Sequence, residues 1–421
     1  MKIDFPFPGY ENIAPVEVPD ANLMGVFAPP VDGHLDESAV LSRGFAEPVG
    51  APRLRDALRS AKRLLMLIDD GTRGTPVPRI LPYVAAELEA AGIPDRSVAV
   101  LTAQGTHRRM NEAELKHKLG DYYARYTIHQ HNWLDESKLR EYGHTSDGVR
   151  VTANRLLAEH DFVLGIGSIV PHRVKGFSGG AKIAFPGVSG REMMEKNQWE
   201  ASLRMSETVM GHPENPMRRR MEEAARLAGL QYIVNVVGDI KGRIVACFTG
   251  EVVAAHREGC KVSCRTHAVH LPERADIVLT DAHPADRDFW QSAKGLYSGT
   301  MAVRRGGSLI NVAPNPEGVA GNHPNLLEIG YRPHAEVVRM VDKGEIHDVV
   351  GAAILGDVAQ IVDHADCISV SPGMSRRDTE RLGMRYAETA QQALEMAFER
   401  QGKAARVAVL RYGGHVLPLA G

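Results

Sequence analysis

A strand, a glycine-rich loop and a helix follow one another repeatedly, and this alternation restricts the fold more than any other feature. The first repeat has the apolar run 64–68 (LLMLI), the loop 69–76 (DDGTRGTP) and a helical pattern at about 77–91. The second has the apolar run 98–102 (VAVLT) and a loop that ends at His107. Buried strands joined through helices pair in parallel, with helices on both faces of the sheet. The sequence therefore predicts an α/β fold with mostly parallel sheets.

The third predicted strand, at about 162–166, precedes the most glycine-rich loop of the chain. Residues 165–190 have the sequence GIGSIVPHRVKGFSGGAKIAFPGVSG. Glycines at 176, 179 and 180 permit positive φ and close approach of a ligand. Successive N–H groups in such a turn can form an anion site beside Lys182, which is a candidate amine nucleophile. The alternative is a surface loop with incidental lysines, because short glycine motifs are weak signals.

The chain is long enough for two domains, since 421 residues exceed one typical hydrophobic core. The alternation is interrupted at 271–274 (LPER) and then restarts. We therefore predict a first domain over 1–271, a second over 272–404, and a final strand and tail over 405–421 that can return to the first domain. If both domains are of this type, the active site is expected in the cleft between them.

Composition argues against several classes of partner. The formal net charge is −2 and no long basic run occurs, so attraction to nucleic acid or to an anionic membrane is not expected. No stretch approaches the roughly 18 apolar residues of a membrane span, and the N-terminus lacks the pattern of a signal peptide. Four cysteines do not form a disulfide framework in a chain of this length. A cytoplasmic protein is the expectation.

Polar residues gather where the predicted strands end. In parallel sheets, ligands bind beyond the carboxyl ends of the strands. Seven side chains lie at or just beyond such ends and are predicted to face one cleft: Asp70, Arg73, His107, His172, Lys182, Gln291 and Lys294.

These residue types suit binding and proton transfer, although each has a simpler explanation. Arg73 can bind a carboxylate or phosphate at a helix N-terminus, or it can be a surface arginine beside a helix cap. His107 and His172 can act as acid and base near neutral pH, although a single histidine at a strand end is more often structural. Gln291 and Lys294 are three residues apart and share a helical face, which can bind a carboxylate or merely be solvated.

Another set of metal-capable residues recurs on one helical stripe, at His256, Cys260, Cys264 and His267. One straight helix cannot surround an ion tetrahedrally with four ligands spread over about three turns. We therefore interpret this stripe as a packed helical face rather than as a zinc site.

Five segments of the chain together resemble the nickel-pincer lactate racemase family: DDGTRGTP, AQGTHRRM, PHRVKGFSGGAKIAFPGV, NPMRRRMEEAARLAGL and FWQSAKG. The resemblance extends from about residue 10 to 415, with the segments in the family's order. It implies two α/β domains with the active site between them. It also implies racemisation or epimerisation of a small 2-hydroxy acid by reversible hydride transfer. The implied cofactor is the nickel-pincer nucleotide, pyridinium-3-thioamide-5-thiocarboxylic acid mononucleotide, and cofactor-maturation enzymes are the implied partners.

The resemblance also implies a role for each motif residue. Lys182 matches the lysine that carries the cofactor, and His107 and His172 match the two histidines that alternate as base. Asp70 and Arg73 match the catalytic aspartate and arginine of the first loop, and Gln291 and Lys294 match the substrate-binding pair. The expected cofactor contacts are Thr72, Gly176, Ser178, Gly179 and Gly180.

Two bases are what a reversible racemisation of this kind requires. Direct proton abstraction from the α-carbon of a 2-hydroxy carboxylate is difficult, because that C–H bond is weakly acidic. Removal of hydride, while a base takes the hydroxyl proton, gives a planar 2-oxo acid that can be reduced on either face. Histidine suits both directions because its pKa lies near the operating pH.

One position departs from the family pattern. The family supplies a histidine ligand to nickel sixteen residues after the cofactor lysine, and here that position is Gln198. An amide is a poorer ligand than imidazole for square-planar nickel. His212 is the nearest histidine that follows. Two alternatives therefore stay open: a hydride-transfer oxidoreductase that uses the pyridinium without nickel, and a non-catalytic cofactor-binding protein.

Overall fold

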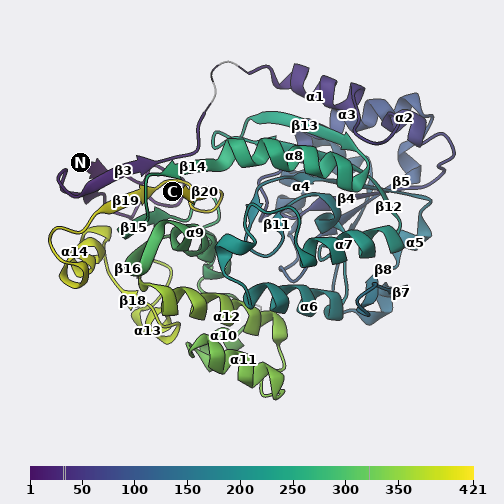
Figure 1. Cartoon of the computed structure of the whole chain (residues 1–421). Coiled ribbons are helices and arrows are strands. Elements are labelled where there is room, and N and C mark those ends of the chain that lie inside the picture. Colours follow the sequence, from purple (N-terminus) through teal and green to yellow (C-terminus); the bar gives the residue numbers. More distant parts are fainter. Residues whose placement is uncertain (32, 34, 322) are drawn as a thin grey trace. The chain divides into compact units, whose positions relative to one another are not determined.

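The computed structural model describes residues 1–31, 33, 35–321 and 323–421, which form two compact α/β units. We call Val31–Asn197 with Gly211–Thr266 the N-terminal unit. The C-terminal unit consists of Met1–Pro30, Gln198–Met210 and His267–Gly421. Figure 1 follows their helices and strands along the chain.

The N-terminal unit is built on a six-stranded sheet with the order β13-β12-β9-β4-β5-β6. Its neighbouring strands are parallel except for the hairpin of β12 and β13. The strands are β4 (Leu64–Asp69), β5 (Val98–Ala103), β6 (Thr127–Gln130), β9 (Phe162–Ser168), β12 (Leu230–Gly238) and β13 (Ile244–Gly250). Two hairpins accompany the sheet: β7 (Leu139–His144) with β8 (Arg150–Asn154), and β10 (Pro171–His172) with β11 (Gly176–Phe177).

Helices connect these strands as the alternating pattern predicts. They are α1 (Glu37–Ala46), α2 (Leu54–Ala57), α3 (Val77–Ala90), α4 (Glu112–Leu119), α5 (Leu156–Glu159), α7 (Pro216–Leu227) and α8 (Val252–His267). Helix α6 (Arg191–Ser202) begins in this unit and ends in the next.

The C-terminal unit has a second six-stranded sheet, all parallel, with the order β18-β17-β16-β15-β19-β3. Its strands are β3 (Leu23–Phe27), β15 (Ala275–Asp281), β16 (Val303–Val312), β17 (Asp366–Val370), β18 (Arg385–Tyr386) and β19 (Val407–Leu410). Its helices are α9 (Phe289–Ala302), α10 (Asn325–Ile329), α11 (His334–Asp342), α12 (Val349–His364), α13 (Arg376–Arg381) and α14 (Ala390–Gln401). Two short pairs complete it: β1 (Lys2–Ile3) with β2 (Val16–Glu17), and β14 (Ala268–Leu271) with β20 (Leu417–Ala420).

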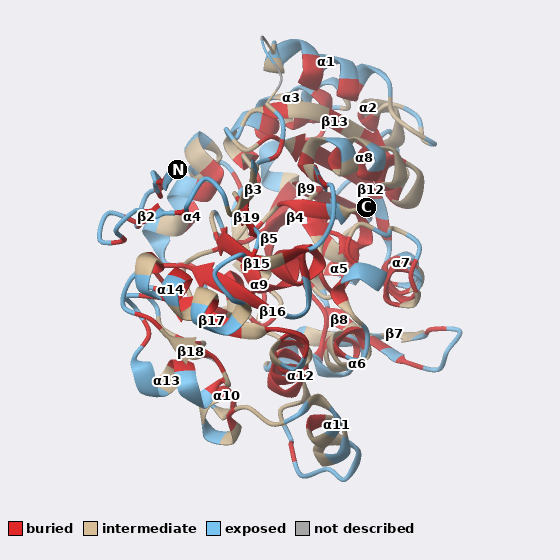
Figure 2. Ribbon diagram, turned by 60° about the vertical axis from the view of Figure 1, so that its left-hand side comes forward, coloured by how far each residue is buried: buried red, intermediate tan, exposed pale blue. Residues whose placement is uncertain are grey.

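Both faces of the central strands are buried, as a continuous apolar strand requires. In β4 all six residues are buried, and Figure 2 colours the central strands red. Leu64, Met66 and Ile68 contribute to one core cluster, whereas Leu65 and Leu67 contribute to another. Alternate side chains point to opposite faces of a strand, so one apolar run supplies the core on both sides of the sheet.

The predicted α/β class with mostly parallel sheets is confirmed, but the two ends of the chain are placed differently from the predicted domain limits. The segments 1–30 and 405–421 both belong to the C-terminal unit. Strand β19 pairs with β15 and with β3, and β20 pairs with β14. Within the segment 405–421, β19 therefore extends the second sheet and β20 pairs with β14, and neither strand joins the first sheet. Among the described residues, no helix has the length and apolar character needed to cross a membrane.

Candidate active site

Three loops of the N-terminal unit meet at one edge of its sheet. Strand β4 lies between β9 and β5, and all three run parallel. Their carboxyl ends therefore face the same side, where Asp70 follows β4, His107 follows β5 and His172 follows β9. This position beyond the strand ends is where open α/β sheets bind ligands.

The first two loops are joined by a hydrogen bond between Asp70 and His107. The distance between Asp70 Oδ2 and His107 Nδ1 is 2.8 Å, and the two side chains are 4% and 17% exposed. An ionised carboxylate only accepts hydrogen bonds, so the proton of this bond belongs to Nδ1. Nε2 of the neutral ring then carries a lone pair and is available as a base.

Thr72 and Arg73 complete the first loop. The backbone N–H of Thr72 donates to Asp70 Oδ1 at 2.6 Å. The Thr72 hydroxyl accepts a hydrogen bond from Arg73 Nη1 at 2.7 Å and lies 3.3 Å from His107 Nδ1. The structure therefore gathers Asp70, Thr72, Arg73 and His107 into one hydrogen-bonded group.

The electrostatic environment favours an ionised Asp70 and a neutral His107. Burial alone would raise the pKa of Asp70, but the hydrogen bond from His107, the positive charge of Arg73 and a hydrogen bond from Thr72 outweigh it and hold that pKa well below its usual value. Burial lowers the pKa of His107 below its ordinary 6.5, and Arg73 and Lys182 add to this effect, although Asp70 opposes it. His107 is therefore a neutral base at physiological pH.

A buried lysine that the sequence analysis did not select supports the first loop from α4. Lys118 is 5% exposed, and its ammonium lies 2.6 Å from Asp69 Oδ1. It also donates to the carbonyl oxygens of Arg73 at 3.1 Å and Thr75 at 3.3 Å. The Thr75 hydroxyl donates to Asp69 and lies 2.9 Å from Ser168 Oγ. Lys118 thus ties α4 to the loop that carries Asp70 and Arg73.

The glycine-rich loop is buried throughout 173–181, which excludes the alternative of an exposed surface loop. Gly176, Gly179 and Gly180 have φ values of +75°, +73° and +59°. A Cβ atom on Gly176 would lie 2.0 Å from the His212 carbonyl oxygen, and one on Gly180 would lie 2.8 Å from the His256 ring. Glycine is required here both for its backbone conformation and for lack of space.

The sequence predicts that successive N–H groups of this loop form an anion site. For three of these N–H groups the prediction is wrong, because each donates a hydrogen bond to an acceptor within the protein. The N–H groups of Ser178, Gly180 and Lys182 donate to Val170 O at 2.8 Å, Asn235 Oδ1 at 2.7 Å and Gly179 O at 3.2 Å. The Ser178 hydroxyl is also engaged, because it donates to the Ser168 carbonyl oxygen at 2.6 Å. These contacts give the loop a fixed shape.

Lys182 lies on the short 3-10 helix η4 (Gly180–Ile183) that ends this loop. Burial lowers the pKa of its ammonium group to about 7, and the positive charges of Arg73 and Arg218 act in the same direction. Asp70 and Asp69 oppose this shift. A substantial fraction of the amine is therefore neutral and nucleophilic near neutral pH. When Lys182 is protonated, its positive charge in turn lowers the pKa of His107.

His172 ends β10, and its ring is oriented by the backbone. The N–H of Val174 donates to His172 Nδ1 at 3.1 Å. In the neutral ring the proton then belongs to Nε2, so this nitrogen is a donor. His107 and His172 therefore present opposite hydrogen-bonding character at Nε2.

In the C-terminal unit, Gln291 and Lys294 lie on the first turns of α9 and contact each other, as their spacing predicts. Lys294 Nζ donates to Gln291 Oε1 at 3.0 Å. Asp288 caps the helix by accepting a hydrogen bond from the Gln291 N–H at 2.8 Å. The pair presents a cation and an amide from one helical face, which suits a carboxylate.

The position expected for a metal ligand is occupied by Gln198 on α6, which is partly exposed. His212, the nearest later histidine, is exposed, and its backbone carbonyl packs against Gly176. Within 1–31, 33, 35–321 and 323–421, no group of three or more His, Cys, Asp or Glu side chains is arranged to bind a metal ion.

Residues of the His256 stripe support the glycine-rich loop from α8. His256 is fully buried, and its Nε2 lies 2.9 Å from the Ser178 carbonyl oxygen. Cys260 Sγ lies 3.5 Å from the same ring nitrogen. These contacts make His256 a packing partner of the loop.

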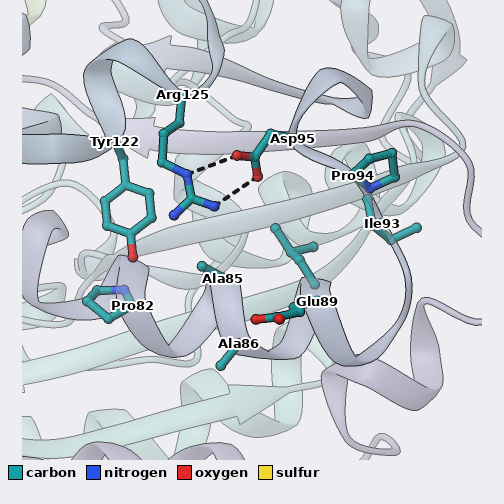
Figure 3. Close-up of a pocket in the computed structure, with 10 residues that line it drawn as sticks. Pro82, Ala85, Ala86, Glu89, Ile93, Pro94, Asp95, Tyr122 and Arg125 are labelled. Carbon is teal, nitrogen blue, oxygen red and sulfur yellow. Dashed lines mark hydrogen bonds and ion pairs between the residues drawn. The ribbon is translucent and has the colours of Figure 1, made fainter.

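A separate surface depression of about 530 Å³ lies beside α3 and contains none of the site residues (Figure 3). Arg125 at its rim is held by Asp95 through two hydrogen bonds, of 2.9 and 3.0 Å, and its guanidinium lies 5.0 Å from the Tyr122 ring centroid. The charge of Arg125 is therefore already satisfied by Asp95.

Comparisons with known proteins identify relatives of the whole chain. The model of the lactate racemase N-terminal domain matches residues 10–211, and that of the lactate racemase C-terminal domain matches residues 271–417. Lactate racemase of Lactiplantibacillus plantarum is 27% identical over 98% of both chains. Lactate racemase of Thermoanaerobacterium thermosaccharolyticum is 29% identical over 76% of both chains.

Solved structures show the same relationship. The lactate racemase apoprotein of Thermoanaerobacterium thermosaccharolyticum superposes with a TM-score of 0.85 at 26% identity, covering 96% of this chain and 97% of that one. A protein from Thermotoga maritima superposes with a TM-score of 0.73 at 20% identity, covering 92% and 99% of the two chains. The second similarity concerns the fold alone.

Replacing Lys118 with methionine should destabilise the protein, because it leaves Asp69 buried without its cation. Breaking one side of a buried ion pair costs about 3 kcal/mol or more. Burial already raises the pKa of Asp69, and a raised pKa in the folded state means that stability is lost as pH rises through it. The thermal midpoint of Lys118→Met should therefore fall by several degrees relative to wild type, and by more at pH 8 than at pH 5.

Lys116→Met is the matched control. Lys116 is on the same helix but forms an exposed pair with Glu112, so its loss should change the midpoint little. Equal midpoints for wild type and Lys118→Met at pH 8 would contradict this account of Lys118.

Proposed function

The chain belongs to the lactate racemase family and is an isomerase, and we propose that it racemises or epimerises a small 2-hydroxy acid, with lactate as the first candidate. The observation that carries the proposal is the Asp70–His107 pair at the same sheet edge as Lys182. A base of this kind next to a nucleophilic amine matches the requirements of the reaction on a hydroxyl-bearing carbon.

The charges of the site fit an anionic, covalently attached nucleotide. Lys182 has an amine that is partly neutral near pH 7, and the cations Arg73 and Arg218 act on it. We propose that Lys182 carries the nickel-pincer nucleotide, which when bound supplies the hydride acceptor. The positive charges nearby would balance its phosphate and thiocarboxylate groups.

The residues of this chain fit a nickel ion less well than they fit the nucleotide. The family histidine is replaced by Gln198, and a carboxamide is a weak donor for nickel. The protein part of the metal site is therefore incomplete in this chain.

His107 begins the reaction in this proposal. Its Nε2 accepts the proton of the substrate hydroxyl while Asp70 stabilises the imidazolium through Nδ1. Arg73 is the proposed anchor of the carboxylate, so that the planar 2-oxo acid stays bound while its carbonyl carbon presents the other face. Gln291 and Lys294 are the carboxylate-binding pair proposed for the C-terminal unit. Burial of the loops limits the access of water to this product.

His172 completes the reaction from the other side. For this step the His172 ring must start as the imidazolium: its Nε2–H gives the proton to the carbonyl oxygen as the carbonyl carbon is reduced, which leaves a neutral ring protonated on Nδ1. In the reverse direction the two histidines exchange roles, and the His172 ring must then carry its proton on Nδ1. Either direction therefore requires the bond from Val174 to break.

The pH dependence of turnover tests the role of His107. A base must be neutral, and the pKa of His107 is lowered from 6.5 mainly by burial. The acid limb of kcat/KM for lactate, followed by chiral chromatography, should therefore lie below pH 6.5. Asp70→Asn removes the carboxylate that raises this pKa, so the limb should move to still lower pH and kcat should fall by roughly 10²-fold or more.

Asp121→Asn, at an exposed position, is the control and should behave as wild type. An acid limb well above pH 6.5, or full activity in Asp70→Asn, would exclude His107 as the base. Absence of racemisation with every 2-hydroxy acid of a panel would exclude the proposed reaction itself.

Cofactor attachment is testable without activity. Protein produced together with the cofactor-maturation enzymes should show a mass increase in intact-mass spectra, and Lys182→Ala should abolish it. Lys241→Ala, at an exposed turn, should leave it unchanged. An adduct that survives Lys182→Ala would assign the attachment to another lysine, of which Lys175 is the first candidate.

Gln198 is the observation that favours the alternative of a hydride-transfer enzyme without nickel. If nickel is used, Gln198→His should raise the nickel content per chain, measured by elemental analysis after loading, because imidazole is the better donor. Racemase activity should rise with it. One nickel ion per chain in the wild type would show that another group already completes the site. The nickel content of His212→Ala would then show whether His212 is that group.

A further inference from the structure

Arg218, in the segment NPMRRRMEEAARLAGL, is a fully buried cation beneath the glycine-rich loop. It lies on α7 with 0% exposure. Its guanidinium donates to the carbonyl oxygens of Gly179 at 3.0 Å and Lys175 at 3.2 Å, and to that of Phe177. A rigid planar fork spreads its donors over three nitrogens and so contacts three carbonyls at fixed positions, whereas the three donors of a lysine all lie on one atom.

One of these carbonyls links Arg218 directly to the backbone of Lys182. Gly179 O accepts hydrogen bonds from both Arg218 Nη1, at 3.0 Å, and the Lys182 N–H, at 3.2 Å. This shared acceptor begins the turn of η4, on which Lys182 lies. The position of the guanidinium therefore fixes the start of the turn that presents the amine.

The charge of Arg218 is not cancelled by a direct ion pair. In the part of the chain that the structure describes, all hydrogen bonds of its guanidinium go to backbone carbonyls. Glu222 and Glu214 act on it electrostatically. Their carboxylates, however, are hydrogen-bonded by Arg257, with distances of 2.7 and 2.5 Å. Carbonyl dipoles stabilise the guanidinium without neutralising it, so its field extends into the loop.

From this geometry we propose that Arg218 is a positioning residue for Lys182: it fixes the loop that carries the amine and places an unneutralised positive charge beneath it. The inference rests on the proposed function in one respect, that Lys182 is the attachment point of the cofactor. It adds a residue that acts through Lys182 and does not itself touch the ligand.

The physical consequence concerns the protonation state of the amine. Burial is the main reason why the pKa of Lys182 falls to about 7, followed by the charges of Arg73 and Arg218. A neighbouring positive charge disfavours the ammonium form. Loss of the Arg218 charge should therefore leave Lys182 more often protonated, and hence less nucleophilic, at neutral pH.

Competitive acetylation of the cofactor-free protein tests this directly. Acetic anhydride is applied between pH 6 and 10, the Lys182 peptide is quantified by mass spectrometry, and exposed Lys116 serves as the internal reference. In the wild type the Lys182 midpoint should lie near pH 7. In Arg218→Gln it should rise by about one unit, which lowers Lys182 labelling at pH 7 about fivefold. An unchanged midpoint in the folded Gln variant overturns the inference.

Arg218→Lys provides a second test that retains a cation. Its three donors lie on one nitrogen at the end of a flexible stem and cannot reproduce the fixed spread of the guanidinium contacts, so its cofactor adduct should fall below half of the wild-type yield. A wild-type yield in Arg218→Lys overturns the positioning role. Absence of any adduct on the wild type contradicts the proposed function instead, and the labelling of the cofactor-free protein still decides the role of Arg218.

Discussion

The 2.8 Å hydrogen bond between Asp70 and His107 is the interaction on which the proposed chemistry depends. It connects the loops after two neighbouring parallel strands, so the fold itself brings the carboxylate and the imidazole together. Because Asp70 is ionised and buried, it assigns the ring proton to Nδ1 and leaves Nε2 as the base. Thr72 and Arg73 hold the same carboxylate and ring in place. Without this bond, nothing in the proposal would fix the tautomer of His107 and so its role as the base.

The site depends on buried cations that the N-terminal unit stabilises in different ways. Lys118 is paired with Asp69 and two loop carbonyls, whereas Arg218 is surrounded by carbonyls alone. Burying an ion costs several kcal/mol unless hydrogen bonds and opposite charge compensate it. In the cofactor-free protein this compensation is incomplete around Lys182, where burial and two positive charges disfavour the ammonium form. An anionic ligand would relieve this repulsion, so cofactor binding and the stability of the loops should be coupled.

The sequence predicted the sheet topology locally and the site in outline, because both follow from short patterns. Apolar runs such as 64–68 predict buried strands, and the residues that follow them fall at one sheet edge. Pairing between strands that are distant in the sequence leaves no such pattern. The sequence therefore does not predict that β3 pairs with β19. Lys118 and Arg218 were missed because a helical pattern does not reveal which of its charged residues are buried. The contacts of the loop N–H groups with Val170 and Asn235 likewise depend on tertiary packing.

The central claim is that Asp70 holds His107 in the tautomer with an unprotonated Nε2, and nitrogen NMR of the cofactor-free protein tests it most directly. Protein labelled with ¹⁵N-histidine is compared with His107→Gln to assign the His107 ring signals. The account predicts that at pH 7 Nδ1 has the shift of a protonated nitrogen and Nε2 that of an unprotonated one. In Asp70→Asn this preference should weaken or reverse. A wild-type ring protonated on Nε2 alone, or on both nitrogens at pH 7, would contradict it.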